Sequence, residues 1–175
     1  MSDAKVEDPA PDEAEAPVPV RPGRKLGLVL GIGLLVVALD QLTKTWALRS
    51  LVDGPVDVIG SLRFQVLYNT GTAFSMGTGR GLGPWISVLA IAVVVGLSLG
   101  DTSRFRLGAI AAGLIAGGAV GNLLDRAFRG DDGFLHGAVV DFIDLQWWPV
   151  FNVADASIVV GACLLVIASL RAPAA

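Results

Sequence analysis

The chain has 175 residues, of which 53% are hydrophobic and 17% are charged, and its formal net charge is −3. Soluble domains carry about 25% charged residues, whereas the apolar residues here form long blocks that suit lipid better than water and are enough for one membrane domain. The single cysteine, Cys163, excludes an internal disulfide and a cysteine-cluster metal site, and the chain has no basic stretch typical of nucleic-acid binding.

The first twenty residues are acidic, with six Asp and Glu residues against the single Lys5 and with Pro and Ala between them. Such a segment buries too little apolar surface to offset the entropy that it would lose on ordering. It also lacks the basic start and the apolar stretch of a cleaved signal peptide. We therefore expect residues 1–24 to form a disordered acidic tail.

Four apolar runs follow the tail. They extend from about Leu26 to Leu39 with an amphipathic continuation through Trp46, from about Trp85 to Leu99, from about Leu107 to Leu124, and from about Val150 to Leu170. The second run is short for a membrane span, which needs about 17–25 residues. Because a helix satisfies its own backbone polar groups in lipid, the runs predict an α-helical integral membrane protein with four transmembrane helices.

The connection between the first two runs alternates between apolar and polar residues. Val56 and Val58 flank Asp57, and Gly60 and Ser61 separate this stretch from a second one. The second stretch has three apolar residues against two polar ones: Leu62, Phe64 and Val66 against Arg63 and Gln65. This period of two around turn residues predicts a β-hairpin, which we place at the membrane surface because lipid does not tolerate an open sheet edge.

Four spans would put both chain ends on one side of the membrane. Basic residues flank the helix ends on that side: Arg21, Arg24, Lys25, Arg104, Arg106 and Arg171. Lys and Arg are enriched on the cytoplasmic side, so both termini are predicted to be cytoplasmic, although five arginines also lie on the other side. Tryptophans, which favour the membrane interface, fall at the opposite helix ends: Trp46, Trp85, Trp147 and Trp148.

Polar residues at membrane depth are costly and are functional candidates, and here they gather near the outer helix ends. Asp40 and Lys44 are four residues apart, so they share a helix face and can pair; a purely structural ion pair and a functional pair are both open. Asn69 follows the hairpin, where it could hold a substrate backbone or only shape a turn. Neither position identifies a function alone.

The third apolar run carries Gly113, Gly117 and Gly121 at four-residue steps. Such a stripe of small residues lets another helix approach closely, either within the chain or in a dimer. Three polar residues lie near its end: Asn122, Asp125 and Arg126. We expect them to face the helix bundle, either as a structural cluster or as part of a site.

Two further aspartates flank the start of the fourth run. Asp141 lies between apolar neighbours, where loss of solvation raises a carboxyl pKa. Asp155 shares a helix face with Asn152, although an acidic residue there often only caps the helix. Two adjacent carboxylates can hydrolyse a peptide without a metal, because one takes a proton from water while the other donates to the scissile carbonyl. Together they form a candidate catalytic pair.

Other chemistries have less support in the sequence. His136 is the only histidine, so a His-rich zinc site is excluded and a Ser-His-Asp triad has no evident partner for it. A Ser75–Lys44 dyad is conceivable, but no feature favours it. A transporter relay through Asp40, Asp125 and Asp155 would need polar steps across the membrane, and the inner halves of the runs are apolar. A non-catalytic scaffold would leave the polar groups unexplained.

Five motifs follow one another between about Leu26 and Arg171. They are Asp40-Gln41-Leu42-Thr43-Lys44, Asn69-Thr70-Gly71-Thr72-Ala73-Phe74-Ser75, Gly117-Gly118-Ala119-Val120-Gly121-Asn122-Leu123-Leu124-Asp125-Arg126, Val139-Val140-Asp141-Phe142 and Phe151-Asn152-Val153-Ala154-Asp155. In this order they resemble the lipoprotein signal peptidases, or type II signal peptidases, which are aspartic peptidases of the bacterial inner membrane.

The resemblance implies four transmembrane helices with a small extracytoplasmic β-sheet cradle in residues 25–171, with a short cytoplasmic tail over 172–175. It places the catalytic pair on Asp141 and Asp155. It also implies supporting or substrate-binding residues: Asp40, Lys44, Asn69, Asn122, Asp125, Arg126 and Asn152. The implied substrate is a prolipoprotein with a diacylglyceryl-modified cysteine, cut just before that cysteine, with no metal or cofactor. Membrane lipid and inhibitors of the globomycin type are the other implied partners.

Two features depart from the family pattern. Residues 127–138 form a longer connection than usual, with Asp131 and Asp132 as additional carboxylates that we expect to be solvated and not catalytic. The acidic tail has no counterpart in the family core, and no role is assigned to it.

Overall fold

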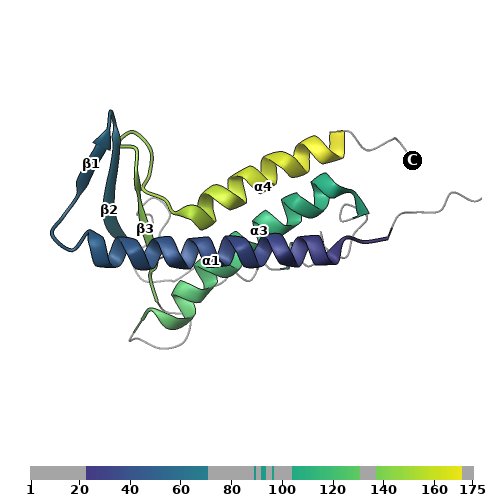
Figure 1. Cartoon of the computed structure of the whole chain (residues 1–175), viewed down its shortest axis with the longest axis horizontal. Helices are drawn as coiled ribbons and strands as arrows, with labels where there is room; N and C mark the ends of the chain where they lie inside the picture. The colour runs from purple at the N-terminus through teal and green to yellow at the C-terminus, as the bar shows by residue number, and fades with distance from the viewer. Residues whose placement is uncertain are drawn as a thin grey trace, which may run out of the picture.

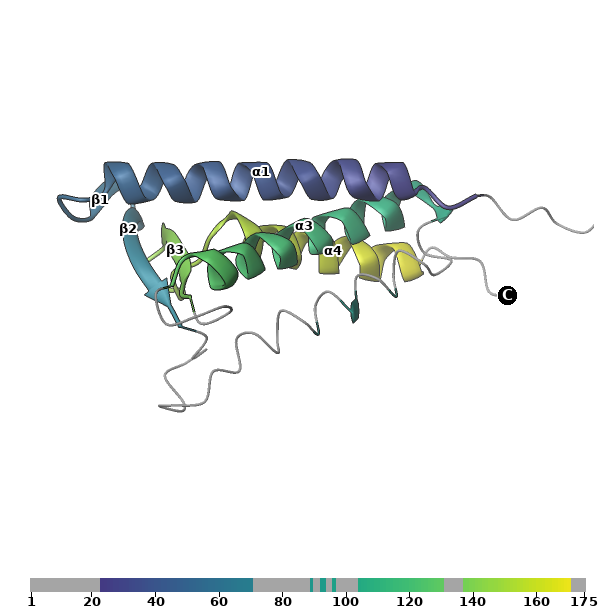
Figure 2. The ribbon, with the colours of Figure 1, turned by 90° about the horizontal axis from the view of Figure 1, so that it is seen from below.

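The computed structural model describes residues 23–70, 104–130 and 137–170, together with the single residues 89, 92, 93 and 96. These residues form helices and a small sheet in the order α1 (Leu26–Ser50), β1 (Val56–Ile59), β2 (Leu62–Asn69), α3 (Arg106–Phe128), β3 (Val139–Asp144) and α4 (Val153–Leu170). The three helices lie side by side, and the sheet lies at one end of them (Figures 1 and 2). The described part of the chain is therefore mostly helical, as predicted.

The helices α1, α3 and α4 have 25, 23 and 18 residues and are long and apolar enough to cross a membrane. Three of the four predicted helices are thus confirmed, as is the prediction that the chain is an integral membrane protein. The second predicted helix, about Trp85 to Leu99, falls almost wholly outside the described residues. Its four described positions, Leu89, Ala92, Val93 and Gly96, are helical, and a fourth span stays a prediction.

Helix boundaries differ from the predicted ones by a few residues. α1 continues past Trp46 to Ser50, and α3 continues to Phe128. α4 begins at Val153 rather than near Val150 because Phe151 pairs with β3: its N–H donates to Ile143 O at 3.0 Å and its O accepts from Ile143 N at 2.8 Å. The backbone there continues the sheet before it turns into the helix.

The glycine stripe of α3 serves packing within the chain. A Cβ atom on Gly117 would lie 2.6 Å from the carbonyl oxygen of Gly33 in α1, and one on Gly113 would lie 2.8 Å from that of Val29. Small residues thus bring the two backbones into contact, as the spacing predicts. α3 packs against both α1 and α4, which contact each other much less.

The sheet is antiparallel, with the strand order β1-β2-β3. Its first two strands are the predicted hairpin, and Gly60 in the turn has φ of 57°. Phe64 of β2 and Phe142 of β3 pack against Trp46 near the end of α1, with ring centroids 5.4 and 6.2 Å from the indole. These aromatic contacts fix the sheet to the helix end.

The third strand, Val139–Asp144, was not predicted from residue pattern. Its first four residues are all buried, so the sequence Val-Val-Asp-Phe lacks the alternation that marks a half-exposed strand. β3 carries Asp141, one of the two candidate catalytic residues, and is therefore the strand that positions the candidate site. The family resemblance implied a sheet cradle without naming this segment.

The start of α1 and the end of α4 lie at the end of the molecule opposite the sheet (Figure 1). Three of the four tryptophans lie at the sheet end: Trp46 contacts the sheet, and Trp147 and Trp148 follow β3. Trp85 lies outside the described residues. The three described tryptophans thus lie at the end opposite the start of α1 and the end of α4.

Candidate active site

Buried polar side chains gather where the three helices meet the sheet. All are at most 9% exposed: Asp40, Lys44, Asn122, Asp125, Asp141, Asp144 and Asn152. Every buried side-chain polar atom among the described residues has a hydrogen-bond partner. This cluster includes most of the residues that the sequence motifs single out.

A fully buried lysine lies at the centre of the cluster. Lys44 Nζ lies 2.8 Å from Asp40 Oδ2 and 2.9 Å from Asp125 Oδ2 and donates a hydrogen bond to Asn122 Oδ1 at 2.9 Å. An ammonium group has three donors, so all three are used. The predicted Asp40–Lys44 pair is confirmed as a contact, and it is a buried one. Asp125 gains a second cation, because Arg129 Nε donates to its Oδ1 at 2.7 Å.

The two carboxylates beside Lys44 also bind backbone N–H groups of other elements. Asp40 Oδ1 accepts from Ala154 N at 3.0 Å, and Asp125 Oδ2 accepts from Val140 N at 3.1 Å. Ala154 lies in the first turn of α4, where unpaired N–H groups favour a carboxylate. The ion cluster therefore fixes the positions of α4 and β3, the elements that carry Asp155 and Asp141.

Asn152 connects the two candidate catalytic carboxylates. Its Nδ2 donates to Asp141 Oδ1 at 2.7 Å, and its backbone N–H donates to Asp155 Oδ2 at 3.3 Å. Its Oδ1 accepts in return from Asp155 N at 2.9 Å. This reciprocal pairing across three residues resembles a capping box at the start of a helix. One residue thus holds both carboxylates, that of Asp141 through its side chain and that of Asp155 through its backbone N–H.

The remaining oxygen of each aspartate accepts from another asparagine. Asn69 Nδ2 donates to Asp141 Oδ2 at 3.1 Å, and Asn122 Nδ2 donates to Asp155 Oδ1 at 2.8 Å. Since Asn122 also accepts from Lys44, it joins the ion cluster to the carboxylate pair. The structure therefore brings together eight residues that the sequence proposed from five separate motifs.

Arg126 completes the predicted set. Its Nη1 donates weakly to the carbonyl oxygen of Asn122 at 3.4 Å, and its charge attracts the carboxylates of Asp155 and Asp141. Its neighbour Asp125 is bound instead by Lys44 and Arg129. A cation next to two carboxylates partly offsets their mutual repulsion.

The two aspartates of β3 have opposite electrostatic environments. Burial, and then the negative charge of Asp155, raise the pKa of Asp141 to about 6, as its apolar neighbours predict. For Asp144, the Gln146 backbone N–H at 2.7 Å and the Arg63 guanidinium hold the pKa below its usual value. Asp144 is thus an ionised structural residue, whereas Asp141 is suited to hold a proton near neutral pH.

A carboxyl group that protonates near pH 6 beside a second carboxylate can perform acid–base hydrolysis. Among the described residues, no group of three His, Cys, Asp or Glu side chains is placed to hold a metal ion. Four residues weighed in other mechanisms or in the longer connection lie outside the described residues: Ser75, Asp131, Asp132 and His136.

Two residues of the cluster, Gln41 and Arg129, were not predicted from the sequence to belong to the site. Gln41 Nε2 donates to Asp125 Oδ1 and to Gly121 O, both at 3.1 Å, and its Oε1 accepts from Arg129 Nη2 at 3.1 Å. Arg129 follows Asp125 by four residues, a spacing that predicts pairing on a helix. Gln41 gives no comparable signal, because all but one of the partners of its side chain lie at least 80 positions away.

Comparisons with known proteins identify close relatives of the chain. A family model described as signal peptidase (SPase) II matches residues 32–171. The lipoprotein signal peptidase of Mycolicibacterium smegmatis is 46% identical over 92% of this chain and 68% of its own. That of Mycobacterium avium is 46% identical over 86% of this chain and 82% of its own. That of Mycobacterium leprae is 43% identical over 93% of this chain and 79% of its own.

A solved structure shows the same fold. It is described as a bacterial membrane enzyme structure by the in meso method at 1.9 Å resolution. It superposes with a TM-score of 0.71 at 28% identity and covers 87% of this chain and 98% of that one.

Proposed function

The chain belongs to the signal peptidase II family and removes signal peptides from prolipoproteins, and we propose that Asp141 and Asp155 are its catalytic pair. The bridge through Asn152, which binds a carboxylate oxygen of each aspartate, carries this proposal. It holds two carboxyl groups in fixed orientations at the sheet end of membrane-crossing helices. This arrangement suits an aspartic peptidase, the activity of the family.

In the proposed reaction the pair shares one proton. The raised pKa of Asp141 supports that proton residing on Asp141 in the free enzyme. Ionised Asp155 takes a proton from water as the water oxygen attacks the scissile carbonyl carbon, and Asp141 protonates the carbonyl oxygen. The tetrahedral intermediate then collapses, the C–N bond breaks, and the leaving nitrogen takes the proton from Asp155. Asp141 recovers its proton from a hydroxyl group of the intermediate as the carboxyl group of the released signal peptide forms.

The supporting residues divide into three groups. Asp40, Lys44 and Asp125 are fully buried, so we assign them to positioning and not to substrate contact. Asn122 and Asn152 orient the carboxylates. Two further residues complete the site: Asn69 from β2, bound to Asp141, and Arg126 from α3, whose charge acts on both aspartates.

The proposed substrate is a prolipoprotein whose cysteine already carries diacylglycerol, with cleavage just before that cysteine. The family match supports this specificity, and the position of the pair at the end of apolar helices suits a scissile bond held near the membrane surface. Membrane lipid and globomycin-type inhibitors are proposed as further ligands on the same resemblance.

We place the sheet on the extracytoplasmic face of the bacterial inner membrane and both chain ends in the cytoplasm. The positions of the α1 start and the α4 end, opposite the sheet, support this orientation (Figure 1). Tryptophans at the sheet end agree with an interfacial belt. Residues 25–171 would form the peptidase domain with four spans, flanked by tails over 1–24 and 172–175.

The protein reconstituted in liposomes tests the proposed specificity. It is expected to cleave a diacylglyceryl-modified prolipoprotein at the bond before the cysteine, as shown by the masses of both products, and to leave the unmodified precursor intact. Equal cleavage of both precursors would contradict the lipid requirement. Proton flux through the liposomes without cleavage would favour a transporter.

A further inference from the structure

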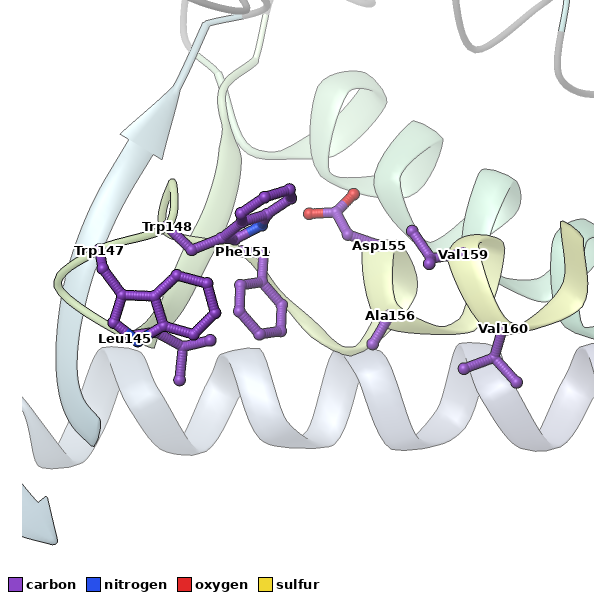
Figure 3. A pocket seen from close by; sticks show the side chains of 8 residues that line it. All are labelled: Leu145, Trp147, Trp148, Phe151, Asp155, Ala156, Val159 and Val160. Atoms are coloured by element: carbon purple, nitrogen blue, oxygen red, sulfur yellow. The ribbon is translucent and has the colours of Figure 1, made fainter. Parts of the chain in front are cut away.

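An apolar groove of about 440 Å³ lies beside Asp155, on the outer side of α4 (Figure 3). Eight residues line it: Leu145, Trp147, Trp148, Phe151, Asp155, Ala156, Val159 and Val160. The lining is almost entirely apolar. Trp147, Trp148, Val159 and Val160 are each more than half exposed, so the groove opens away from the bundle core.

We propose that this groove holds one acyl chain of the lipid on the substrate's cysteine, an inference that rests on the proposed function. The groove adjoins the site, because Asp155 is one of its lining residues and the Asp155 carboxylate is joined to Asp141 through Asn152. The modified cysteine directly follows the scissile bond. Its lipid therefore starts beside the catalytic pair, and so beside the groove.

The direction of the groove suits a lipid chain. It runs from the tryptophans after β3 along the first turns of α4, with Val159 one turn beyond Asp155 and Val160 one turn beyond Ala156 (Figure 3). α4 is long and apolar enough to cross the membrane. An occupant lying along it would be parallel to the surrounding lipid chains.

The signal peptide fits the groove less well than an alkyl chain does. A helix with side chains is about 10–12 Å wide and rises about 5.4 Å per turn, so about one turn would fill the volume. An extended peptide would bring unpaired N–H and C=O groups against carbon, which is costly. An alkyl chain has neither problem, since it is narrow and has no polar groups.

The groove would act by positioning rather than by affinity. Lipid tails are as apolar as the groove lining, so moving an acyl chain from bilayer to groove yields little transfer energy. Holding the chain instead fixes the cysteine, and with it the scissile bond, at the catalytic pair. Blocking the groove should therefore reduce kcat/KM while the protein stays folded.

Substitution of Val159 by Trp fills the groove, and Val166→Trp is its matched control. Both valines lie on α4, seven residues apart on one face, and they are 62% and 58% exposed, but only Val159 lines the groove. We expect at least a tenfold fall in kcat/KM for the lipidated prolipoprotein with Val159→Trp and less than a twofold change with Val166→Trp. Equal activity of the two variants would overturn the groove assignment while wild-type cleavage keeps the proposed function intact.

Photocrosslinking of the wild-type protein gives a second test that does not depend on a variant. A diazirine in the substrate's acyl chain should label the segment containing Trp148, Phe151 and Val159, and unlabelled lipidated substrate should compete. Labelling of this segment from a diazirine in the signal peptide instead would overturn the proposal. So would labelling by a diazirine phospholipid that the substrate does not displace, since the groove would then hold bilayer lipid only.

Discussion

The carboxylate of Asp40 accepts a hydrogen bond from the backbone N–H of Ala154 at 3.0 Å, although 114 positions separate the two residues. Asp40 belongs to α1 and Ala154 to the first turn of α4, directly before Asp155. One helix thus supplies the N-terminal cap of another. Because the same carboxylate pairs with Lys44, the position of Asp155 depends on a buried ion cluster.

Substitution of Asp40 should separate its two roles. Asp40→Asn keeps an oxygen for the Ala154 N–H but loses the charge beside Lys44, whereas Asp40→Ala loses both. Breaking a buried ion pair costs about 3–5 kcal/mol, and loss of a cap adds about 0.5–2 kcal/mol. We expect Asp40→Ala to be the less stable variant in thermal unfolding in detergent. Equal destabilisation by both variants would show that the Ala154 bond contributes nothing.

Lys44→Met should be among the most destabilising single changes. It keeps much of the side-chain volume but leaves the buried carboxylates of Asp40 and Asp125 without their shared cation, at a cost of about 3–5 kcal/mol. Asp125 keeps Arg129 as a partner, and adding Asp40→Asn removes the charge that Lys44→Met leaves unpaired, so the double variant should be more stable than the sum of the two changes by about 0.5–3 kcal/mol. A double-mutant cycle on unfolding free energies measures this; strict additivity would argue against the pair.

Gly121 of α3 lies against both the ion cluster and the start of α4. A Cβ atom there would lie 2.6 Å from Asp40 Oδ2, so Gly121→Ala must displace the carboxylate that holds Lys44 and Ala154. We expect lower stability and lower cleavage. The control is Gly31→Ala on α1, where a Cβ atom has nothing within 4 Å and should be neutral or stabilising by up to about 1 kcal/mol. A neutral Gly121→Ala would mean that Asp40 can relax freely.

The raised pKa of Asp141 makes stability depend on pH. The folded state favours the neutral carboxyl, so its contribution to stability is full below the ordinary pKa of 3.8 and is lost as the pH rises through about 6. The difference between these values corresponds to about 3 kcal/mol. Between about pH 3.5 and pH 8, the stability of Asp141→Asn relative to wild type should shift in favour of the variant by that amount, measured by unfolding in detergent. A constant difference would mean that Asp141 titrates normally.

The helices and the near-neighbour pairs could be predicted from sequence because their cause is local. Long apolar runs predict helices in lipid, and a separation of four residues predicts the Asp40–Lys44 contact. The pattern of five polar groups near the outer helix ends, together with the family resemblance, identified eight residues that the structure brings together. Local spacing and composition thus predicted the helices and the ion pair, and the resemblance supplied the assignment of the site residues.

The contacts between distant elements could not be predicted in this way. Nothing near Asp40 in the chain indicates Ala154, and nothing near Asp125 indicates Val140, because these bonds depend on how α1 and α3 pack against α4 and β3. β3 itself was missed because burial on both faces removes the alternation that marks a strand. The apolar groove beside Asp155 likewise arises only when the segment after β3 folds back along α4.

The cleavage rates of Asp141→Asn and Asp155→Asn test the catalytic pair most directly. Asp57→Asn serves as the matched control, since Asp57 is an exposed aspartate on β1 of the same sheet. With a diacylglyceryl-modified prolipoprotein, each of the first two variants should lose about 10³-fold or more in kcat while remaining folded by thermal unfolding, and the control should match wild type. Cleavage within a few fold of wild type by either folded variant would contradict the assignment of Asp141 and Asp155.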